Sequence, residues 1–222
     1  MVLESLRARV QPYIARLARP YLGWSPGTLS VLALLLAVAA GFLALLVRWT
    51  TPDLFLGVAL LVFFAGLFDV IDGEVARETG RASARGDFVD HVFDRYADVA
   101  ILLGIAVSTY ANPFLALLAL VSLLLVSYMG TQAQAVGLGR LYGGLLSRAD
   151  RLVVLALVTF LEFDWSLPWP WAPSAPWSHF HVGVVSFTVI DVGLAYFVIA
   201  GQWTAIARAL RVYRALPPAG TP

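Results

Sequence analysis

A succession of long apolar segments constrains this chain more than any other feature. The first of them, residues 29–47, contains no charged side chain. A helix needs about 20 consecutive apolar residues to cross the hydrocarbon core of a bilayer, which is roughly 30 Å thick. Inside that core the backbone must satisfy its own hydrogen bonds, and this favours helices. The chain is therefore expected to fold as a bundle of membrane-spanning helices.

The composition supports this expectation. Hydrophobic residues make up 60% of the chain and charged residues only 13%, and the mean hydropathy of +0.81 lies outside the usual range of soluble proteins. We predict an all-α integral membrane protein with about six transmembrane helices in one domain, residues 25–214. The expected spans are residues 29–47, 54–77, 87–110, 113–134, 149–163 and 182–211.

The segments outside these spans have patterns of their own. Residues 1–24 combine apolar residues at helical spacing with several arginines, which is typical of an amphipathic helix in the membrane interface. An ordinary solvated helix is the alternative, and Pro12 is expected to bend or break the helix. Residues 164–181, rich in tryptophan and proline, are expected to form an interfacial loop, and residues 215–222 a flexible tail.

The arginines predict an orientation. Every basic residue is an arginine, and assigning alternate sides to the loops places all of them except Arg48 on one side. The positive-inside rule then puts both termini and the acidic segments on the cytoplasmic side of the cell membrane. Any phosphate binding must use guanidinium groups. The absence of cysteine excludes structural disulfides and thiolate catalysis.

A cluster of acidic residues begins at the end of the second apolar segment, in the stretch FDVIDGEVAR, residues 68–77. Each residue turns a helix by about 100°, so Asp69 and Asp72 lie about 60° apart on one stripe. Gly73 and Ala76 fall on the same stripe. The acidic face is therefore also a face with little side-chain bulk.

The next helix continues the acidic pattern after a short polar turn. Its aspartates recur at steps of three or four residues and lie within about 80° of arc. They are Asp87, Asp90, Asp94 and Asp98. By the same arithmetic Glu74 and Glu78 point away from the stripe of the preceding helix, and we expect them to be surface acids.

Carboxylates close to hydrocarbon normally face a bundle interior and need a positive partner. Few arginines share these stripes, so divalent cations are the expected partners. Mg²⁺ and Mn²⁺ prefer oxygen ligands, and two such ions about 3.5–4 Å apart can hold the oxygens of a phosphoryl displacement. The alternative, that the acids are solvated helix ends, accounts for Asp87 and Asp90. It does not account for Asp69, Asp94 or Asp98.

The spacing of these residues resembles, without departure, the signature of the CDP-alcohol phosphotransferase family. The matching positions are Asp69, Asp72, Gly73, Ala76, Arg77, Gly86, Asp90 and Asp94. The earlier stretch SPGTLS, residues 25–30, is similar to the family's Thr-Pro-Asn-x-Leu-Thr element, although Gly27 stands in place of the asparagine. The six-span layout extends the resemblance over most of the chain.

This resemblance implies transfer of a phosphatidyl-type group from a CDP-linked lipid to a small polar alcohol, with release of CMP. Asp69, Asp72, Asp90 and Asp94 would bind two Mg²⁺ or Mn²⁺ ions, and Asp94 would also be the general base. The residues that would bind the nucleotide are Asp69, Gly73, Ala76, Arg77 and Gly86. The resemblance also implies a homodimer in the lipid bilayer, and no nucleic-acid partner is expected.

Three arginines after the fourth span are candidates for binding an acceptor phosphate, because guanidinium groups grip phosphate through two hydrogen bonds. They are Arg140, Arg148 and Arg151. Positive-inside topology alone is the alternative explanation. The local pattern is similar to the phosphatidylinositol-phosphate and archaetidylinositol-phosphate synthase branch, so inositol phosphate is the expected acceptor. Glycerol phosphate is the alternative, and the donor lipid carries either diacylglycerol or archaeol.

Four further residues have open roles. Asp87 is interpreted as a helix cap or a neighbour of the metal ligands, and Asp98 as a hydrogen-bonding group within the bundle. His91 lies beside the acidic stripe and could tune it. Asp191, inside the sixth span, is expected to form an interhelical hydrogen bond. A function of another class, cation transport, would need acids near the membrane midplane, whereas these gather towards one face.

Overall fold

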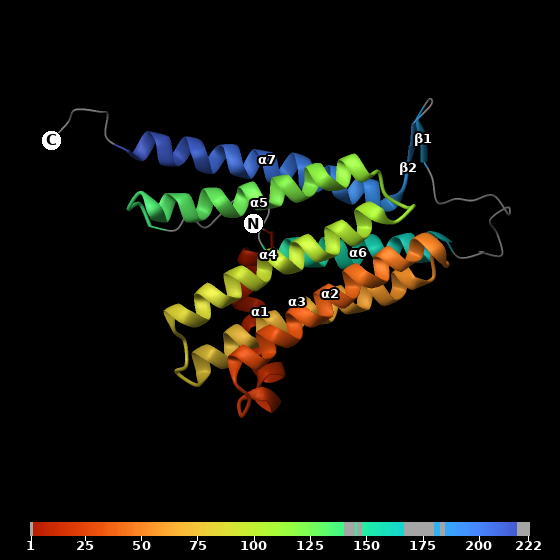
Figure 1. Cartoon of the computed structure of the whole chain (residues 1–222). Helices are drawn as coiled ribbons and strands as arrows, with labels where there is room; N and C mark the ends of the chain where they lie inside the picture. Colours follow the sequence, from red (N-terminus) through yellow and green to blue (C-terminus); the bar gives the residue numbers. More distant parts are fainter. Residues whose placement is uncertain (1, 140–144, 146–147, 167–179, 183–184, 217–222) are drawn as a thin grey trace.

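The computed structural model describes residues 2–139, 145, 148–166, 180–182 and 185–216. These residues form seven α-helices, two 3₁₀ turns and one short antiparallel pair of strands (Figure 1). The helices are α1 Val2–Ala18, α2 Pro26–Leu46, α3 Leu54–Glu78, α4 Ala84–Val107, α5 Pro113–Ala135, α6 Arg148–Ser166 and α7 Val189–Ala215. The 3₁₀ turns are η1 Arg19–Tyr21 and η2 Val47–Trp49, and the strands are β1 Phe180–Val182 and β2 Val185–Phe187. The predicted all-α class is confirmed apart from this small hairpin.

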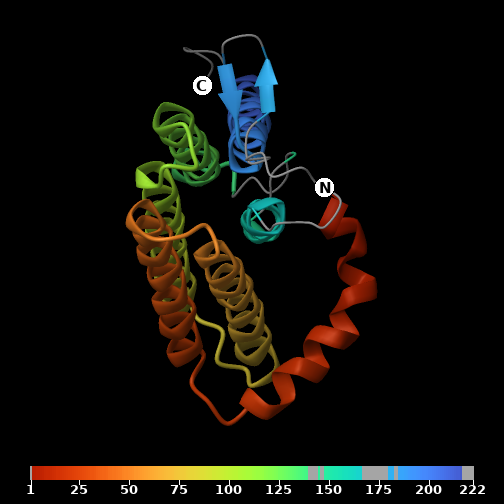
Figure 2. The ribbon, with the colours of Figure 1, turned by 90° about the vertical axis from the view of Figure 1, so that its right-hand side faces the viewer.

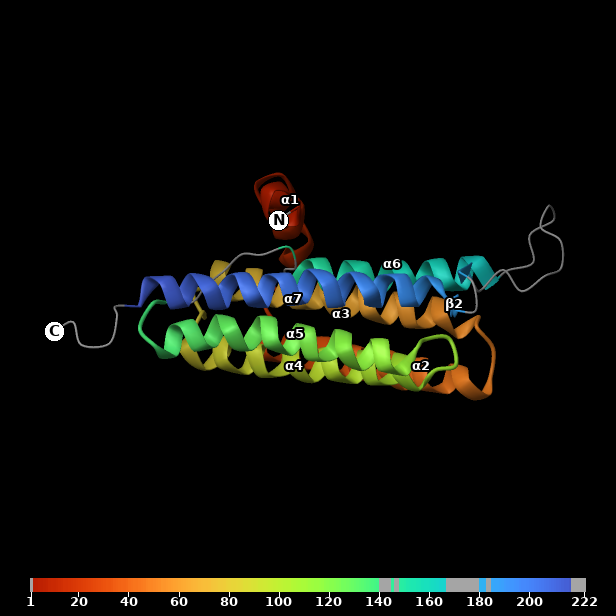
Figure 3. The same cartoon turned by 90° about the horizontal axis from the view of Figure 1, so that it is seen from above.

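Helices α2 to α7 pack as a ring in which each helix contacts two neighbours. The order around the ring is α2, α3, α6, α7, α5 and α4, and α4 packs against α2 again. Figure 2 looks along several of these helices and shows α1 outside the ring. Figure 3 shows that the ring helices run along a roughly common direction. Since α2 packs against both α3 and α4, these two helices flank it.

Small residues let α2 and α4 approach each other closely. The buried face of α2 consists largely of alanines. Where the two helices cross, a Cβ atom on Gly41 would collide with the carbonyl group of Ala100, and one on Gly104 with the carbonyl group of Gly41. Such contacts are typical of helix packing in membranes, where backbones come close together. Both glycines are therefore required because a side chain would not fit between the helices, and not because of their backbone conformation.

The outside of the ring is apolar. Phe42, Phe63, Phe114, Ile199 and Trp203 are each more than half exposed, and an apolar surface of this extent is unusual on a soluble protein. Among the described residues, four helical segments are long and apolar enough to cross a membrane. They are residues 26–49, 54–78, 113–135 and 189–215. The spans predicted in α4 and α6 do not meet that standard, because both helices carry several charged residues.

Capping residues explain where helix ends differ from the prediction. Ser83 accepts a hydrogen bond from the amide of Gly86, so α4 begins at Ala84 rather than at residue 87. The N-terminal end of α7 is fixed by a capping box at Thr188, so the predicted start at residue 182 is wrong. Residues 180–182 and 185–187 pair instead as strands. Most of the predicted interfacial loop and of the predicted tail lies outside the described residues.

The N-terminal helix α1 lies against one member of the ring. It continues through Pro12, so the proline does not break it. Val10, Tyr13 and Leu17 are exposed on it. Helix α1 packs against α3, and Figure 2 shows it leaning away from the remainder of the ring. Its apolar side chains are therefore available to surroundings other than the ring.

Candidate active site

The turn between α3 and α4 brings two acidic helix ends together. Helix α3 ends at Glu78, and Gly80 in the turn has a φ of 66°, a left-handed conformation that glycine adopts readily. Ser83 then caps α4 with a 3.1 Å hydrogen bond from the amide of Gly86. The chain therefore reverses within a few residues, and the last turns of α3 and the first turns of α4 lie at the same end of the ring (Figure 1).

The first acidic group combines two residues of α3 with one of α4. Asp69, Asp72 and Asp90 each contribute an oxygen to a set whose members lie within 4.8 Å of one another. Asp72 is buried, and its Oδ2 atom accepts a 2.6 Å hydrogen bond from the hydroxyl of Ser30 on α2. Three carboxylates at this separation repel one another unless cations lie between them. The set therefore fits a divalent cation with oxygen ligands.

The second acidic group lies on α4 and shares Asp90 with the first. Asp90, His91 and Asp94 also place ligand atoms within 4.8 Å of one another, and Asp94 is buried. The Nδ1 atom of His91 lies 3.7 Å from Oδ2 of Asp90. The structure thus brings together the four aspartates that the sequence singled out. His91, whose role the sequence left open, lies among them.

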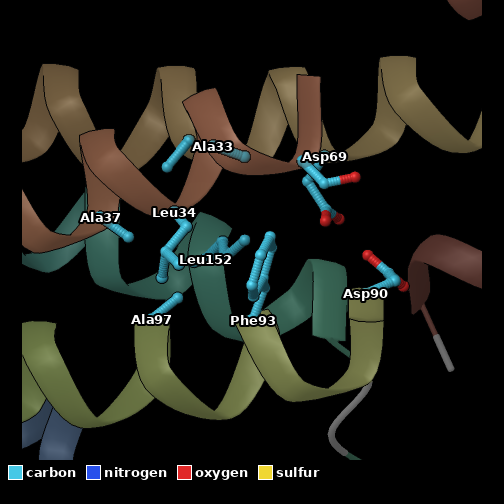
Figure 4. A pocket seen from close by; sticks show the side chains of 10 residues that line it. Ala33, Leu34, Ala37, Asp69, Asp90, Phe93, Ala97 and Leu152 are labelled. Carbon is cyan, nitrogen blue, oxygen red and sulfur yellow. The ribbon is translucent and has the colours of Figure 1, made fainter. Parts of the chain in front are cut away.

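An apolar pocket adjoins these carboxylates. Helices α2, α3, α4 and α6 all contribute to its lining, and the carboxylates of Asp69 and Asp90 lie together at one end of it (Figure 4). Away from them the lining consists of Phe93 and of small or aliphatic side chains. These are Ala33, Leu34, Ala37, Ala65, Ala97 and Leu152. The acidic group therefore borders an apolar space inside the ring.

The predicted nucleotide-binding residues occupy the end of α3 and the start of α4. Gly73 is half-buried, Gly86 is exposed, and the side chain of Arg77 is 51% exposed. Arg77 donates hydrogen bonds from Nε and Nη2 to Oε2 of Glu74, at 3.2 and 2.6 Å. Glu74 is buried, so the prediction that it is a surface acid is wrong. Glu78 is exposed, as predicted.

Two arginines lie close to the later aspartates of α4, Asp94 and Asp98. This differs from the expectation that few arginines lie near the acidic residues. Arg151 of α6 is buried, and its Nη1 atom donates to Oδ2 of the buried Asp98. The Nη2 atom of Arg95 lies 3.4 Å from Asp98 and 3.5 Å from Asp94. The predicted structural role of Asp98 agrees with this ion pair, which joins α4 to α6.

The other predicted residues are placed as follows. Arg148 is the first residue of α6, but its side chain lies outside the described residues, and so does Arg140. Of the three predicted acceptor-binding arginines, only Arg151 can therefore be located in full. Asp87 is exposed in the first turn of α4, where the capping residue is Ser83 rather than Asp87.

At the other end of the ring a second set of acids is engaged by backbone amides. Asp191 accepts hydrogen bonds from the amides of Thr188 at 3.2 Å and of Asn112 at 2.7 Å. Glu162 of α6 is fully buried and accepts a 3.3 Å hydrogen bond from the amide of Ile190. The interhelical hydrogen bond expected for Asp191 is thus present, and the residue lies in the first turn of α7.

Sequence reasoning did not assign roles to Ser30, Glu74 and Arg95. Ser30 is the last residue of the SPGTLS stretch, which was noted as a motif without a contact for this hydroxyl. Arg95 directly follows Asp94, and this adjacency was a visible signal. The burial of Glu74 depends on α1, whose position against α3 no local pattern reveals.

Comparison with known proteins agrees with this fold. The profile of the CDP-alcohol phosphatidyltransferase family matches residues 24–185. The chain belongs to this family, and it is therefore a transferase of phospholipid biosynthesis. The match covers the turn between α3 and α4 and every aspartate of the two acidic groups.

The named relatives include archaetidylinositol and phosphatidylinositol phosphate synthases. The chain is 32% identical over 165 residues to the archaetidylinositol phosphate synthase of Methanothermobacter thermautotrophicus, covering 72% of this chain and 77% of that protein. It is 33% identical over 170 residues to the phosphatidylinositol phosphate synthase of Mycobacterium tuberculosis, covering 73% of this chain and 75% of that protein.

Solved structures of the Mycobacterium tuberculosis phosphatidylinositol phosphate synthase, PgsA1, have the same fold. The structure with CDP-DAG bound gives a TM-score of 0.68 at 26% identity and covers 94% of this chain and 97% of that chain. The structure in complex with manganese and citrate gives a TM-score of 0.69 at 25% identity, covering 94% and 92%.

Proposed function

We propose that this protein transfers a diacylglycerol-phosphate or archaeol-phosphate group from a CDP-linked lipid to a hydroxyl of inositol phosphate, and that it releases CMP. The observation that carries the proposal is the convergence of Asp69, Asp72, Asp90 and Asp94 at one end of the ring. The names of the relatives, which are phosphatidylinositol and archaetidylinositol phosphate synthases, support inositol phosphate over glycerol phosphate as the acceptor.

The four aspartates would hold two divalent cations, Mg²⁺ or Mn²⁺. Asp90 belongs to both acidic groups and would contribute to binding at each of them. When bound, such ions neutralise a diphosphate and its leaving oxygen. The manganese complex of the relative supports this assignment. The apolar pocket beside Asp69 and Asp90 suits a donor whose diphosphate is attached to an apolar lipid.

Asp94 would act as the general base. Its carboxylate takes the proton of the acceptor hydroxyl, and the acceptor oxygen forms a bond to the phosphorus that carries the lipid. The bond from that phosphorus to the oxygen shared with CMP breaks, and CMP leaves with the electron pair. Asp94 is buried, and the Nη2 atom of Arg95 lies 3.5 Å from its Oδ2 atom, so a cationic group lies beside the carboxylate that would take the proton.

The nucleotide would bind at the junction of α3 and α4. Gly73, Ala76 and Gly86 leave room there, while Asp69 and Arg77 contact the nucleotide. On the acceptor side Arg151, with Arg148 and Arg140, would bind the phosphate of inositol phosphate. Asp98 holds Arg151 in place through the buried ion pair. A guanidinium fixed in this way still has donors available for a phosphate.

The remaining helices would complete a membrane domain. We propose that α4 and α6 span the bilayer together with the four apolar helices, since they are members of the same ring. Residues 25–214 then form one six-span domain, and α1 in residues 1–24 lies in the interface through its exposed apolar side chains. Both termini and the aspartates would face the cytoplasm. The protein would act as a homodimer.

One assay tests this function. Purified protein is supplied with Mg²⁺ or Mn²⁺, a CDP-lipid and a panel that contains inositol phosphate, glycerol phosphate and free inositol, and CMP release is measured. We expect release with inositol phosphate and little with the other two. Release with glycerol phosphate alone would overturn the acceptor assignment. Metal-dependent cation flux in liposomes without CMP release would favour transport instead.

A further inference from the structure

Glu74 is a buried acid of α3 that no step of the proposed reaction uses. It lies between Asp72 and Arg77 in the chain, and its residue surface is only 5% exposed. A carboxylate is rarely buried unless its oxygens accept hydrogen bonds or pair with a cation. Both kinds of partner are present here, and each comes from a different part of the molecule.

The cationic partner is Arg77, one turn along the same helix. Its Nε and Nη2 atoms both donate to Oε2 of Glu74, so the planar guanidinium group is fixed in orientation. The third nitrogen, Nη1, lies 3.4 Å from the position that a Cβ atom of Gly73 would occupy. The edge of Arg77 that does not face Glu74 therefore lies over Gly73, next to the metal ligand Asp72.

The neutral partner is Gln11 of α1. Its Nε2 atom lies 2.8 Å from both oxygens of Glu74, 63 residues away in the chain. Helix α1 otherwise stands outside the ring and leans away from it (Figure 2). The amide of Gln11 thus shields the face of the carboxylate that α3 leaves open, and it ties the N-terminal helix to the end of α3 that carries Asp69 and Asp72.

We propose that Glu74 is a positioning residue for donor binding, and that α1 takes part in donor binding through Gln11. The inference rests on the proposed function, in which Arg77 contacts the nucleotide of the CDP-linked donor. Glu74 holds the guanidinium of Arg77 over Gly73, and Gln11 holds Glu74. The side chain of Arg77 remains 51% exposed in this arrangement, so the fixed group is accessible to a ligand.

The test compares three purified variants, Glu74→Gln, Gln11→Ala and the control Glu78→Gln. Glu78 lies on the same last turns of α3 but is exposed. The Michaelis constant for the CDP-lipid is measured at saturating inositol phosphate and Mn²⁺. Loss of a charge-assisted hydrogen bond should raise this constant about fivefold to tenfold in Glu74→Gln and about threefold in Gln11→Ala, with kcat within about twofold. Glu78→Gln should match the wild type.

The double variant that combines Gln11→Ala with Glu74→Gln tests whether the two residues act together. If Gln11 acts through Glu74, the double variant should bind the donor no more weakly than Glu74→Gln alone, because residues of one network are not additive. A fall in kcat with an unchanged Michaelis constant in both single variants would overturn the inference. Should Glu74→Gln fail to fold, Gln11→Ala decides alone, since Gln11 lies outside the ring.

Direct titration with CDP-lipid in Mn²⁺, without acceptor, separates this inference from the proposed function. Tight donor binding by the wild type that weakens in Glu74→Gln supports the inference even if no CMP is released, and only the acceptor chemistry then fails. Equal donor affinity in wild type and Glu74→Gln overturns the inference and leaves the proposed function intact. A wild type that binds no CDP-lipid overturns both.

Discussion

The ring carries acids at both ends, and the two sets are satisfied in different ways. At the end near α1, Asp69, Asp72 and Asp90 place oxygens of three carboxylates within 4.8 Å of one another. At the opposite end, Asp191 and Glu162 accept hydrogen bonds from backbone amides at the start of α7. Acids at the first end gather against each other, whereas those at the second end lie against a helix terminus.

This difference distinguishes a set of acids that can bind cations from a set that stabilises the end of a helix. The amides at a helix N-terminus lack partners within the helix and carry partial positive charge, so a carboxylate there needs no external ion. Carboxylates that approach one another repel, and cations between them offset that repulsion. Burial of an acid therefore does not identify a site in this protein, but the nature of its neighbours does.

Removal of divalent metal should have the largest effect on activity. It should affect only the end of the ring that carries the four aspartates. Chelation with EDTA is expected to reduce CMP release to background, and added Mg²⁺ or Mn²⁺ should restore it. The hydrogen bonds of Asp191 need no metal, so the helical content measured by circular dichroism should not change. Full activity in EDTA would contradict the metal assignment for the four aspartates.

Asp94→Asn should lower kcat by about 10²–10⁴-fold, which is the usual contribution of a general base. The matched variant Asp191→Asn at the other end should retain the rate within about twofold. Donor affinity is measured alongside by titration, and it should change much less than kcat in Asp94→Asn. Equal rates for the two variants would remove the distinction between the ends.

Asp98→Asn breaks the buried ion pair that links α4 to α6. It leaves Arg151 buried without its charge partner, so we expect a stability loss of about 3 kcal/mol. We also expect the Michaelis constant for inositol phosphate to rise more than that for the CDP-lipid, because Arg151 belongs to the proposed acceptor side. Thermal unfolding in detergent and steady-state kinetics measure the two effects. A rise confined to the CDP-lipid constant would place Arg151 on the donor side.

Asp191→Ala removes the side-chain half of the capping box of α7, in which the amide of Thr188 donates to Asp191, and the hydrogen bond from the amide of Asn112. Loss of such a cap typically lowers stability by about 1 kcal/mol. The melting temperature should fall by a few degrees while kcat and both Michaelis constants stay at wild-type values. A large loss of activity at an unchanged melting temperature would show that this end has a chemical role.

Glu162→Gln should have the smallest effect. The carboxamide oxygen can still accept the hydrogen bond from the amide of Ile190, so the expected change in stability is about 1 kcal/mol or less. Binding of Mn²⁺ to the purified protein, measured by calorimetry, should keep its stoichiometry. A lost Mn²⁺ equivalent in this variant would show that the far end also binds a cation.

Local patterns in the sequence were sufficient for much of the acidic site. Asp69 and Asp72 lie at helical spacing before a short turn, and Asp90 and Asp94 follow it, so helix geometry alone brings them together. Glu74 was misassigned because its burial comes from α1, which is distant in sequence. Asp98 and Arg151 likewise meet only because α6 packs beside α3 in the ring, and no spacing rule predicts that neighbour.

Predictions of helix boundaries were less accurate than predictions of helices. The apolar content of residues 182–188 favoured a helix, but residues 185–187 pair with residues 180–182, and the capping box at Thr188 delays the start of α7. The hydrophobicity of a segment indicates that it is buried in lipid or protein. It does not distinguish a strand from the first turn of a helix. The hydrogen bonds of a capping side chain decide that difference.

The order of helices around the ring has a consequence for biogenesis. Asp98 is synthesised 53 residues before Arg151, and until then its cationic neighbour is Arg95 of the same helix, 3.4 Å away. The contact that this ion pair makes between α4 and α6 can therefore form only after α6 has been synthesised. The pairing of Asp98 with Arg151 is therefore a late event in the assembly of the ring.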